Sequence, residues 1–170
     1  MAIRTEKELD AALEKAFKED EAFAQWFLAR TKFAHRGAKY FWSRSDHPWG
    51  RIPYATINTQ TGASEISLKE SETDVLVVFQ AQDEEFLALH IENKIGSGKF
   101  TALQPELYAP RAEHWKGNPK YGAYTDYQTI LVAPRIFQER NKFQAHIFDC
   151  FIAHEEIAGF IPLFTQSLSA

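Results

Sequence analysis

Glu92 and Lys94 lie two positions apart in the stretch LHIENKIGSG, residues 89–98. The apolar neighbours predict a β-strand here, and side chains at positions i and i+2 share one face of a strand. The carboxylate and the ammonium group therefore project together, while Asn93 points to the opposite face. Buried charges are costly unless they pair with each other or bind a metal ion. Taken alone, the pair favours a structural ion pair, with a catalytic pair as the alternative.

A third charged residue, Asp74, opens the apolar run DVLVVFQ. The polar stretch AQDEE, residues 81–85, separates this run from the next one and has the length of a hairpin loop. If the hairpin is symmetric about Asp83, the residue that faces Asp74 is Glu92. Directly opposed residues of an antiparallel pair lie on one face, with Cβ atoms ~5 Å apart. A slip of one residue in the register would separate the two carboxylates.

Two carboxylates at that distance repel each other unless a cation or a proton lies between them. A hard divalent cation, Mg²⁺ or Mn²⁺ as its substitute, prefers oxygen ligands and completes its shell with water and phosphate oxygens. A protonated lysine cannot be a ligand, but it can orient an attacking water and offset charge on a phosphate. The pattern is therefore typical of metal-assisted hydrolysis at a phosphate, with Asp74, Glu92 and Lys94 as candidate catalytic residues. Asp74 and Glu92 are also the expected metal ligands.

Asp74, the pair Glu92-x-Lys94, and a following helix with Gln104 and Tyr108 resemble the PD-(D/E)XK nuclease superfamily. The string IENKI followed by Gln-x-x-x-Tyr is similar to a bacterial and phage branch of that superfamily. The resemblance implies a restriction-endonuclease-like core with the order α-β-β-β-α-β. It also implies a metal-dependent endonuclease that hydrolyses phosphodiester bonds.

The resemblance covers about residues 70–135, with a weaker part that reaches back to the first helix. Thr73 precedes the first acid, where the name of the superfamily has proline. Pro105 and Pro110 are a second departure, because proline at the latter position should kink or end the helix.

The resemblance implies further site residues. It implies that the backbone carbonyl of Asn93 is a third metal ligand. It also implies that the first helix contributes an acid, for which Glu21 is preferred to Asp20. Gln104 and Tyr108 help to place the lysine and the nucleic-acid backbone.

Helical spacing puts Arg111 on the same face of this helix as Gln104 and Tyr108. Thr101 and Gln104 also match a capping box, which gives Gln104 a structural role. This role can replace its role in the active site or accompany it.

The elements that must position these residues follow from hydrophobic periodicity and turn signals. We expect helices over 5–30, about 101–115, from Pro134 and near 154–161. We expect strands over 52–58, 64–69, 128–133 and 144–152. A hairpin of two strands is expected over 73–95. Residues 31–51 and 116–127 are expected to be irregular. This order predicts an α/β fold with a mixed central β-sheet flanked by helices.

The composition predicts a compact, single nuclease-like domain over 1–170. The chain is 45% apolar and 14% aromatic, which is enough for a real core and argues against disorder. The one cysteine, Cys150, lies in an apolar string and is expected to be buried and inert. The N-terminus is unlike a signal peptide, and no run approaches membrane-spanning length. We expect a cytoplasmic protein without a membrane partner. The sequence is also compatible with a homodimer.

Basic residues gather in a segment that is otherwise hard to assign. The net charge of the chain is −4, but residues 30–51 carry a local balance of +5, and Tyr40, Phe41, Trp42 and Trp49 lie among the charges. Interleaved basic and aromatic residues suit phosphate tracking and base stacking, with Arg36, Lys39 and Arg44 as candidate contacts. A solvated loop packed by its aromatic residues explains the segment equally well.

Two competing motifs are weaker. The string GSGKFT follows a strand and opens a helix, but its glycine spacing and the Phe100 after Lys99 depart from a phosphate-binding P-loop. The six histidines lack metal-ligand spacing and are expected to be structural.

Three functions remain open at this level. The first is an endonuclease that binds nucleic acid, with DNA favoured and with RNA, strand state and sequence preference undetermined. The alternative is a catalytically inactive nuclease fold that binds nucleic acid or a protein. The third is an unrelated α/β protein with a structural Glu–Lys pair.

Overall fold

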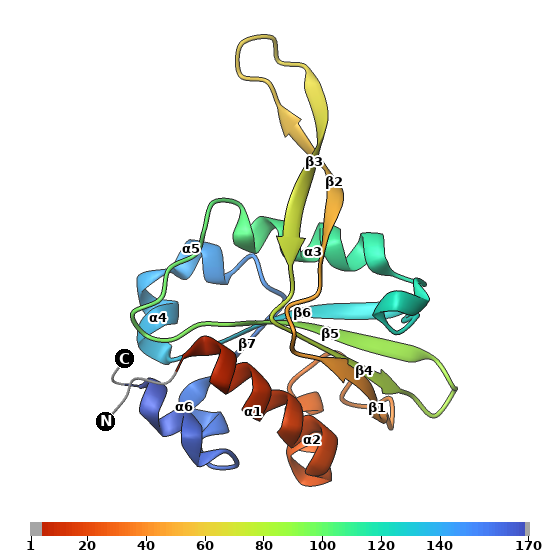
Figure 1. The fold of residues 1–170 in the computed structure, drawn as a ribbon, viewed down its shortest axis with the longest axis vertical. Coiled ribbons are helices and arrows are strands. Elements are labelled where there is room, and N and C mark those ends of the chain that lie inside the picture. The colour runs from red at the N-terminus through yellow and green to blue at the C-terminus, as the bar shows by residue number, and fades with distance from the viewer. Residues whose placement is uncertain (1–4, 169–170) are drawn as a thin grey trace.

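The computed structural model describes residues 5–168, which form an α/β fold around a mixed five-stranded β-sheet (Figure 1). The strand order is β1-β4-β5-β6-β7. β4 is antiparallel to β1 and β5, whereas β6 is parallel to β5 and β7. The strands are β1 (Lys39–Arg44), β4 (Val75–Gln80), β5 (Phe86–Asn93), β6 (Asp126–Ala133) and β7 (Cys150–Ala153). The predicted mixed central sheet is confirmed.

Helices cover both faces of this sheet. One face carries α1, α2 and α6, and the other carries α3, α4 and α5 (Figure 1). The helices are α1 (Glu6–Glu19), α2 (Glu21–Leu28), α3 (Gln104–Trp115), α4 (Arg135–Arg140), α5 (Lys142–Ala145) and α6 (His154–Ile157), with 3-10 turns at η1 (Pro119–Tyr121) and η2 (Pro162–Ser167). None of the helices in the described part of the chain has the length and apolar character needed to cross a membrane.

Side-chain alternation along the central strands explains the two helical layers. The odd-numbered residues of β4 pack in the core cluster that contains α1 and α2. Leu76 and Val78 point the other way and pack with Trp115 of α3. Because both faces are covered, β4 is a continuous apolar run rather than an alternating one.

The hairpin of β4 and β5 has the symmetric register that the sequence predicts. Val75 pairs with Ile91 and Gln80 pairs with Phe86. The same register, continued by one residue, sets Asp74 opposite Glu92.

The predicted first helix is two helices that meet at Asp20. This residue ends α1, and its carboxylate accepts a hydrogen bond from the backbone N–H of Phe23 at 3.1 Å, which caps α2. At the other end of α1, Thr5 and Glu8 form the predicted capping box. The polar residue that interrupts the apolar stripe is therefore a cap that starts a new helix.

Two predicted segments are wrong. Residues 31–51 are not wholly irregular, because 39–44 pair with β4 as strand β1. Charged residues at both ends of this strand hide its half-buried middle. The predicted strand over 144–152 is helical at its start, in α5, and only β7 is a strand, with Cys150 half-buried rather than buried.

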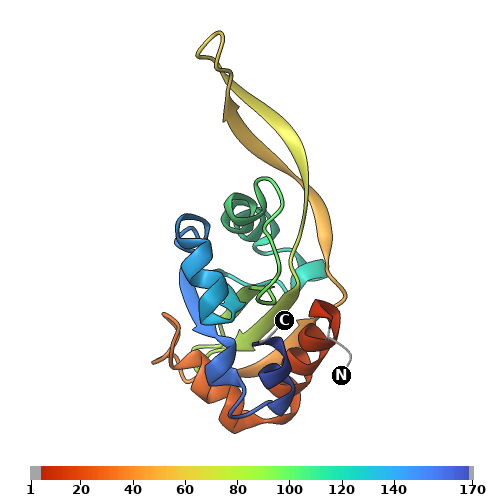
Figure 2. The same ribbon diagram turned by 90° about the vertical axis from the view of Figure 1, so that its left-hand side faces the viewer.

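Two further strands leave the body as a two-stranded antiparallel ribbon. β2 (Trp49–Ile57) and β3 (Ser64–Glu72) pair over nine positions, and both views show the ribbon standing away from the rest of the molecule (Figures 1 and 2). The register puts Ile57, Ile66 and Leu68 on one face, and all three are exposed. The strands of the ribbon are longer than the predicted strands 52–58 and 64–69. The first residue of β2 and the last residue of β3 both lie near the start of β4.

Candidate active site

The three predicted catalytic residues lie at one end of the sheet. Asp74 directly precedes β4, Glu92 is next to last in β5, and Lys94 follows β5. The backbone N–H of Lys94 donates to the carbonyl of Val132 at 2.9 Å, which continues the pairing of β5 with β6. The exposed fractions of the three residues are 5%, 1% and 7%, respectively. Charged groups are therefore buried where the central strands end.

Glu92 is held on both of its oxygens. Nζ of Lys94 lies 3.0 Å from Oε1, and the amide Nε2 of Gln104 donates to the same oxygen at 2.7 Å. The hydroxyl of Tyr108 donates to Oε2. A carboxylate offers about four acceptor positions, so these three contacts leave one for a further partner. The predicted placement of Gln104 and Tyr108 beside the acid–lysine pair matches this geometry.

Gln104 contacts both the turn before α3 and Glu92, but the predicted capping box is only half formed, because no side chain caps α3 at its N-cap residue Leu103. The Oε1 of Gln104 accepts the backbone N–H of Thr101 at 3.1 Å while its amide nitrogen contacts Glu92. Pro105 lies in the first turn of α3, where a missing N–H costs nothing. Pro110 does not end the helix as expected, because α3 continues to Trp115, and its last turns are held by buried side chains.

Arg111 lies on the same helix and is buried beneath the cluster. Its Nε donates to Oγ1 of Thr73 at 2.8 Å, Nη1 donates to Oγ of Ser71, and the guanidinium lies 4.0 Å from the ring of Tyr108. Among the described residues, Nη2 has no hydrogen-bond partner. Arg111 thus supplies a buried positive charge and ties α3 to the end of β3.

Asp74 makes contacts on two sides. Its Oδ2 accepts the backbone N–H of Asn93 at 2.9 Å, and its own N–H donates to the hydroxyl of Tyr108 at 3.4 Å. Its Oδ1 lies 3.6 Å from Nδ1 of His47. The acid is therefore positioned by the end of β5, by α3 and by the loop that precedes the ribbon.

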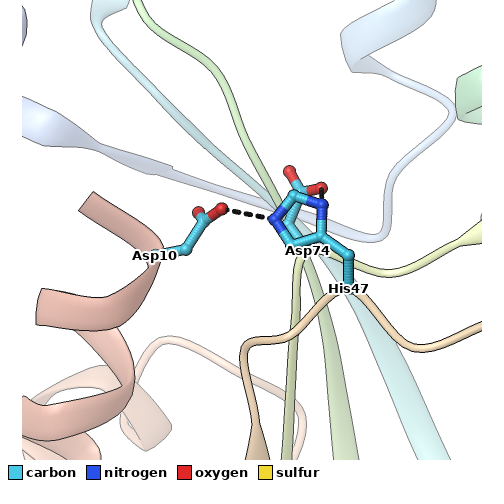
Figure 3. Close-up of side chains that lie close together, drawn as sticks. All are labelled: Asp10, His47 and Asp74. Carbon is cyan, nitrogen blue, oxygen red and sulfur yellow. Dashed lines mark hydrogen bonds and ion pairs between the residues drawn. The ribbon is translucent and has the colours of Figure 1, made fainter. Parts of the chain in front are cut away.

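Asp10 and His47 complete a second group that the sequence did not predict. Nε2 of His47 lies 2.9 Å from Oδ2 of Asp10, which is fully buried on α1 (Figure 3). Oδ1 of Asp10 accepts a hydrogen bond from the side chain of Asn93 at 2.9 Å. One ligand atom each from Asp10, His47 and Asp74 lies within 4.8 Å of the others. This group has the ligand types of a metal site.

The acid that the first helix contributes to this group is Asp10. Glu21, predicted for that position, is exposed at the start of α2 and lines a separate hollow with Lys39 and Tyr40. Asp20 is the helix cap described above. A usable signal did exist, because Asp10 precedes the buried Leu13 and Phe17 by three and seven positions and so lies on the buried stripe of α1.

His47 had no comparable signal in the sequence. It lies in the loop between β1 and the ribbon and has a φ of 53°, a backbone conformation that is uncommon for residues other than glycine. Such strained positions are often found at functional sites. His47 precedes the first strand of the ribbon and Asp74 follows the second. The two residues meet because both strands join the body at the same place.

Burial and mutual repulsion govern the charges of the site. Burial, together with the charges of Glu92 and Asp10, raises the pKa of Asp74 well above its ordinary value. Burial also raises the pKa of Glu92, although Lys94 and Tyr108 oppose the effect. Burial opposes the charged form of Lys94, but the neighbouring carboxylates outweigh it and raise its pKa. The carboxylates thus repel one another in a buried place, and a cation between them would relieve this repulsion.

His47 responds to the same carboxylates. Its hydrogen bond with Asp10 raises its pKa, against the opposing effect of burial. The protonated imidazole is therefore favoured between the two aspartates, and a metal ion that binds His47 would have to displace this proton.

The predicted basic contacts are not brought together. Arg36 pairs with Asp83 and Glu85 at the far end of β4 and β5, and Lys39 begins β1 near that end. Arg44 lies at the other end of β1 and pairs with Asp46 through two hydrogen bonds. The positive charge of the segment is thus distributed from the turns before β1 to the far end of that strand and is largely paired.

Two buried histidines have structural partners, as predicted. His90 lies 2.9 Å from Oγ1 of Thr73 and 2.9 Å from the hydroxyl of Tyr124. His154 lies 2.7 Å from Oδ1 of Asn93 and also contacts Ser167. His47 is the exception to the structural interpretation.

A scan against protein-family models, a search of curated proteins and a search of solved structures each found no match for this chain. The chemistry of the site therefore rests on its own geometry. Two carboxylates and one imidazole suit a divalent ion such as Mn²⁺, while the carboxylates and the carbonyl of Asn93 also suit Mg²⁺. The donor set fits a metal ion of the kind predicted from the sequence.

Proposed function

We propose that this protein is a metal-dependent nuclease that hydrolyses phosphodiester bonds of nucleic acid. The observation that carries the proposal is the convergence of Asp74, Glu92 and Lys94 at one buried end of the sheet, with Lys94 3.0 Å from Glu92. Charges of this number are rarely buried in a core for stability alone, because their desolvation costs more than an apolar replacement would.

The order of elements gives further support. When the ribbon, α2 and the 3-10 turn η1 are set aside, the remaining order α1, β1, β4, β5, α3 and β6 is that of the α-β-β-β-α-β core of the PD-(D/E)XK nucleases. Gln104 and Tyr108 contact the acid from the helix that follows it, as the resemblance implies. The metal would be held by Asp74 with Glu92 or with Asp10 and His47, and by the carbonyl of Asn93. When bound, it would polarise the phosphate and lower the pKa of a water.

The residues of the chain then have separate tasks. Lys94, whose raised pKa keeps it protonated, offsets the charge that builds on the phosphate and orients the water. Tyr108 and Gln104 fix the direction of the Glu92 carboxylate. Arg111 lowers the electrostatic cost of keeping Glu92 ionised in a buried place.

A non-cutting nuclease fold is the second candidate, and two observations favour it. The acceptor positions of Glu92 are mostly occupied by protein donors. Arg36 and Arg44 are paired within the chain, which weakens the case for a phosphate-tracking surface.

Incubation with plasmid, single-stranded DNA and RNA in Mg²⁺, Mn²⁺ or EDTA tests the proposal. We expect cleavage of at least one substrate with a divalent ion and none in EDTA, and loss of cleavage in Asp74→Asn. Binding without cleavage under all of these conditions would support the second candidate. Cleavage that persists in Asp74→Asn would place the reaction elsewhere.

A further inference from the structure

A cleft of about 470 Å³ lies beside the candidate active site, between the base of the ribbon and the start of α3. Trp49, Glu70 and Glu72 line it from the ribbon, and Thr101, Gln104 and Arg111 line it from the other side. This volume is in the range of small-ligand sites. The cleft therefore has room for one nucleoside-sized group.

Gln104 connects this cleft with the acid–lysine cluster. It lines the cleft, and its amide donates to Glu92 at 2.7 Å. A nucleotide whose phosphate reaches Glu92 and Lys94 therefore has its neighbouring base within reach of the cleft.

The charges of the cleft favour a base over a phosphate. Glu70 and Glu72 are exposed carboxylates on its ribbon side. Glu70 lies 3.5 Å from Arg51 and Glu72 lies 3.3 Å from His47, and each keeps further acceptor positions for a ligand. Carboxylates accept hydrogen bonds and donate none, so that they suit amino groups. Arg111 also lines the cleft; its Nε and Nη1 are bonded to Thr73 and Ser71, and its Nη2, which has no partner among the described residues, can donate to an acceptor atom of a base.

Trp49 provides an aromatic surface at the same place. Its side chain is 59% exposed, which is high for the largest aromatic residue. Its backbone carbonyl accepts a hydrogen bond from the hydroxyl of Tyr121, at 3.4 Å. An exposed indole on a fixed backbone is suited to stacking on a base.

We propose that this cleft binds one unstacked nucleobase with an exocyclic amino group, from the nucleotide next to the cleaved phosphate. The inference rests on the proposed function, since it assigns the strand state of the same substrate. A base inside a duplex must be unpaired and unstacked to enter the cleft. Single-stranded nucleic acid is therefore the preferred substrate class, with cytosine preferred over thymine, which lacks the amino group.

Binding of short labelled oligonucleotides in EDTA tests the site without cleavage. We expect an oligo-dC to bind at least roughly threefold more tightly than an oligo-dT, as for one added hydrogen bond, and an abasic strand to bind more weakly than both. Trp49→Ala should weaken oligo-dC binding roughly 5- to 100-fold, and Trp49→Phe should retain most of it. Phe143→Ala removes an exposed aromatic side chain outside the cleft and should change nothing.

The outcomes separate this inference from the nuclease proposal. Equal affinities for dC, dT and abasic strands, a duplex that binds as well as a single strand, or a Trp49→Ala variant with unchanged affinity would each overturn the base site. If cleavage is normal in these cases, the nuclease proposal stands alone. If the oligonucleotides bind as expected but nothing is cut with any metal ion, the base site stands and the nuclease proposal fails.

Discussion

Lys94 is the residue whose surroundings constrain the chemistry most. Glu92, Glu6 and Asp74 together raise its pKa although burial acts against its charge. A lysine in this state is a fixed positive charge and not a proton acceptor at neutral pH. Its contribution is therefore electrostatic, directed at the phosphate and the attacking water.

Replacement of Lys94 by alanine should separate catalysis from binding. We expect cleavage to fall by roughly 10²-fold or more, the usual effect of losing one preorganised charge. Nucleic-acid affinity should change little. The fold should persist, because Gln104 and Tyr108 still contact Glu92. Gel assays and circular dichroism measure the two effects.

The double variant Lys94→Ala with Glu92→Gln is the control for a stranded charge. If the single variant is unstable and the double variant recovers stability, the pair is mainly structural. A folded Lys94→Ala variant that cuts at the normal rate would refute the catalytic role.

The metal site should be detectable by thermal shift. A divalent ion that binds the folded state alone adds RT ln(1 + [L]/Kd) to its stability. We expect Mn²⁺ or Mg²⁺ to raise the Tm of the wild type, and Asp74→Asn to abolish the rise. Asp10→Asn and His47→Gln should reduce it, with the Mn²⁺ effect falling more in His47→Gln because imidazole favours the softer ion.

Glu21→Gln is the matched control, because this acid lies away from the cluster. A shift that survives in Asp74→Asn would mean that the ion binds elsewhere. A shift lost in Glu21→Gln would restore the first-helix acid that the sequence alone suggested.

At the scale of elements, the site depends on which helix face and which strand end meet. α1 brings Asp10 to the end of β5, and its boundary with α2 fixes the angle at which the next helix packs on the sheet. Asp20 at that boundary has a capping role, while Asp10, nearer the start of α1, belongs to the acid cluster. Two acids about three turns apart in one predicted helix thus have different surroundings.

Asp20→Ala should therefore destabilise the fold without touching the site. The loss of an N-cap typically costs about 1 kcal/mol of unfolding free energy. Urea unfolding should show this decrease, and the Tm rise caused by a divalent ion should remain. A loss of the metal effect with unchanged stability would contradict the assignment.

The hairpin could be derived from the sequence, and the rest of the site could not. The symmetric turn fixed the register, so that Asp74 and Glu92 were correctly expected to face each other. Helical spacing shows only that Gln104 and Tyr108 share one face of a helix, and it is the family resemblance that implies that this face lies toward the acid–lysine pair. His47 was missed because its position depends on a long excursion of the chain and not on local periodicity. The basic residues were overvalued, since the acids that pair with Arg36 lie far away in the sequence.

At the scale of the whole molecule, buried histidines set the response to acid. Burial lowers the pKa of His154 to about 3, compared with about 6.5 in an unfolded chain. Below pH 6.5 the unfolded state binds a proton that the folded state does not accept, so stability falls as pH falls. His90, whose pKa burial also lowers well below its ordinary value, acts in the same direction.

The effect of His154 can be measured as a difference between two proteins. From pH 7.5 to pH 5 the wild type should lose about 2 kcal/mol through this residue. His154→Gln should lack that loss, and urea unfolding at the two pH values measures it. The raised pKa values of Asp74 and Glu92 act in the opposite direction, but they are present in both proteins and largely cancel. An identical pH dependence in the two proteins would show that His154 is accessible to protons in the folded state.

The ribbon has a consequence for how this molecule can change. Its two strands leave and rejoin the body side by side, with His47 just before one end and Asp74 just after the other. Equal numbers of residues can therefore be added to or taken from both strands without altering the spacing of these two residues. The length of the ribbon and the geometry of the acid cluster can therefore change independently of each other. A designer could replace the outer half of the ribbon by a tight turn, or lengthen it, and keep the acid cluster unchanged.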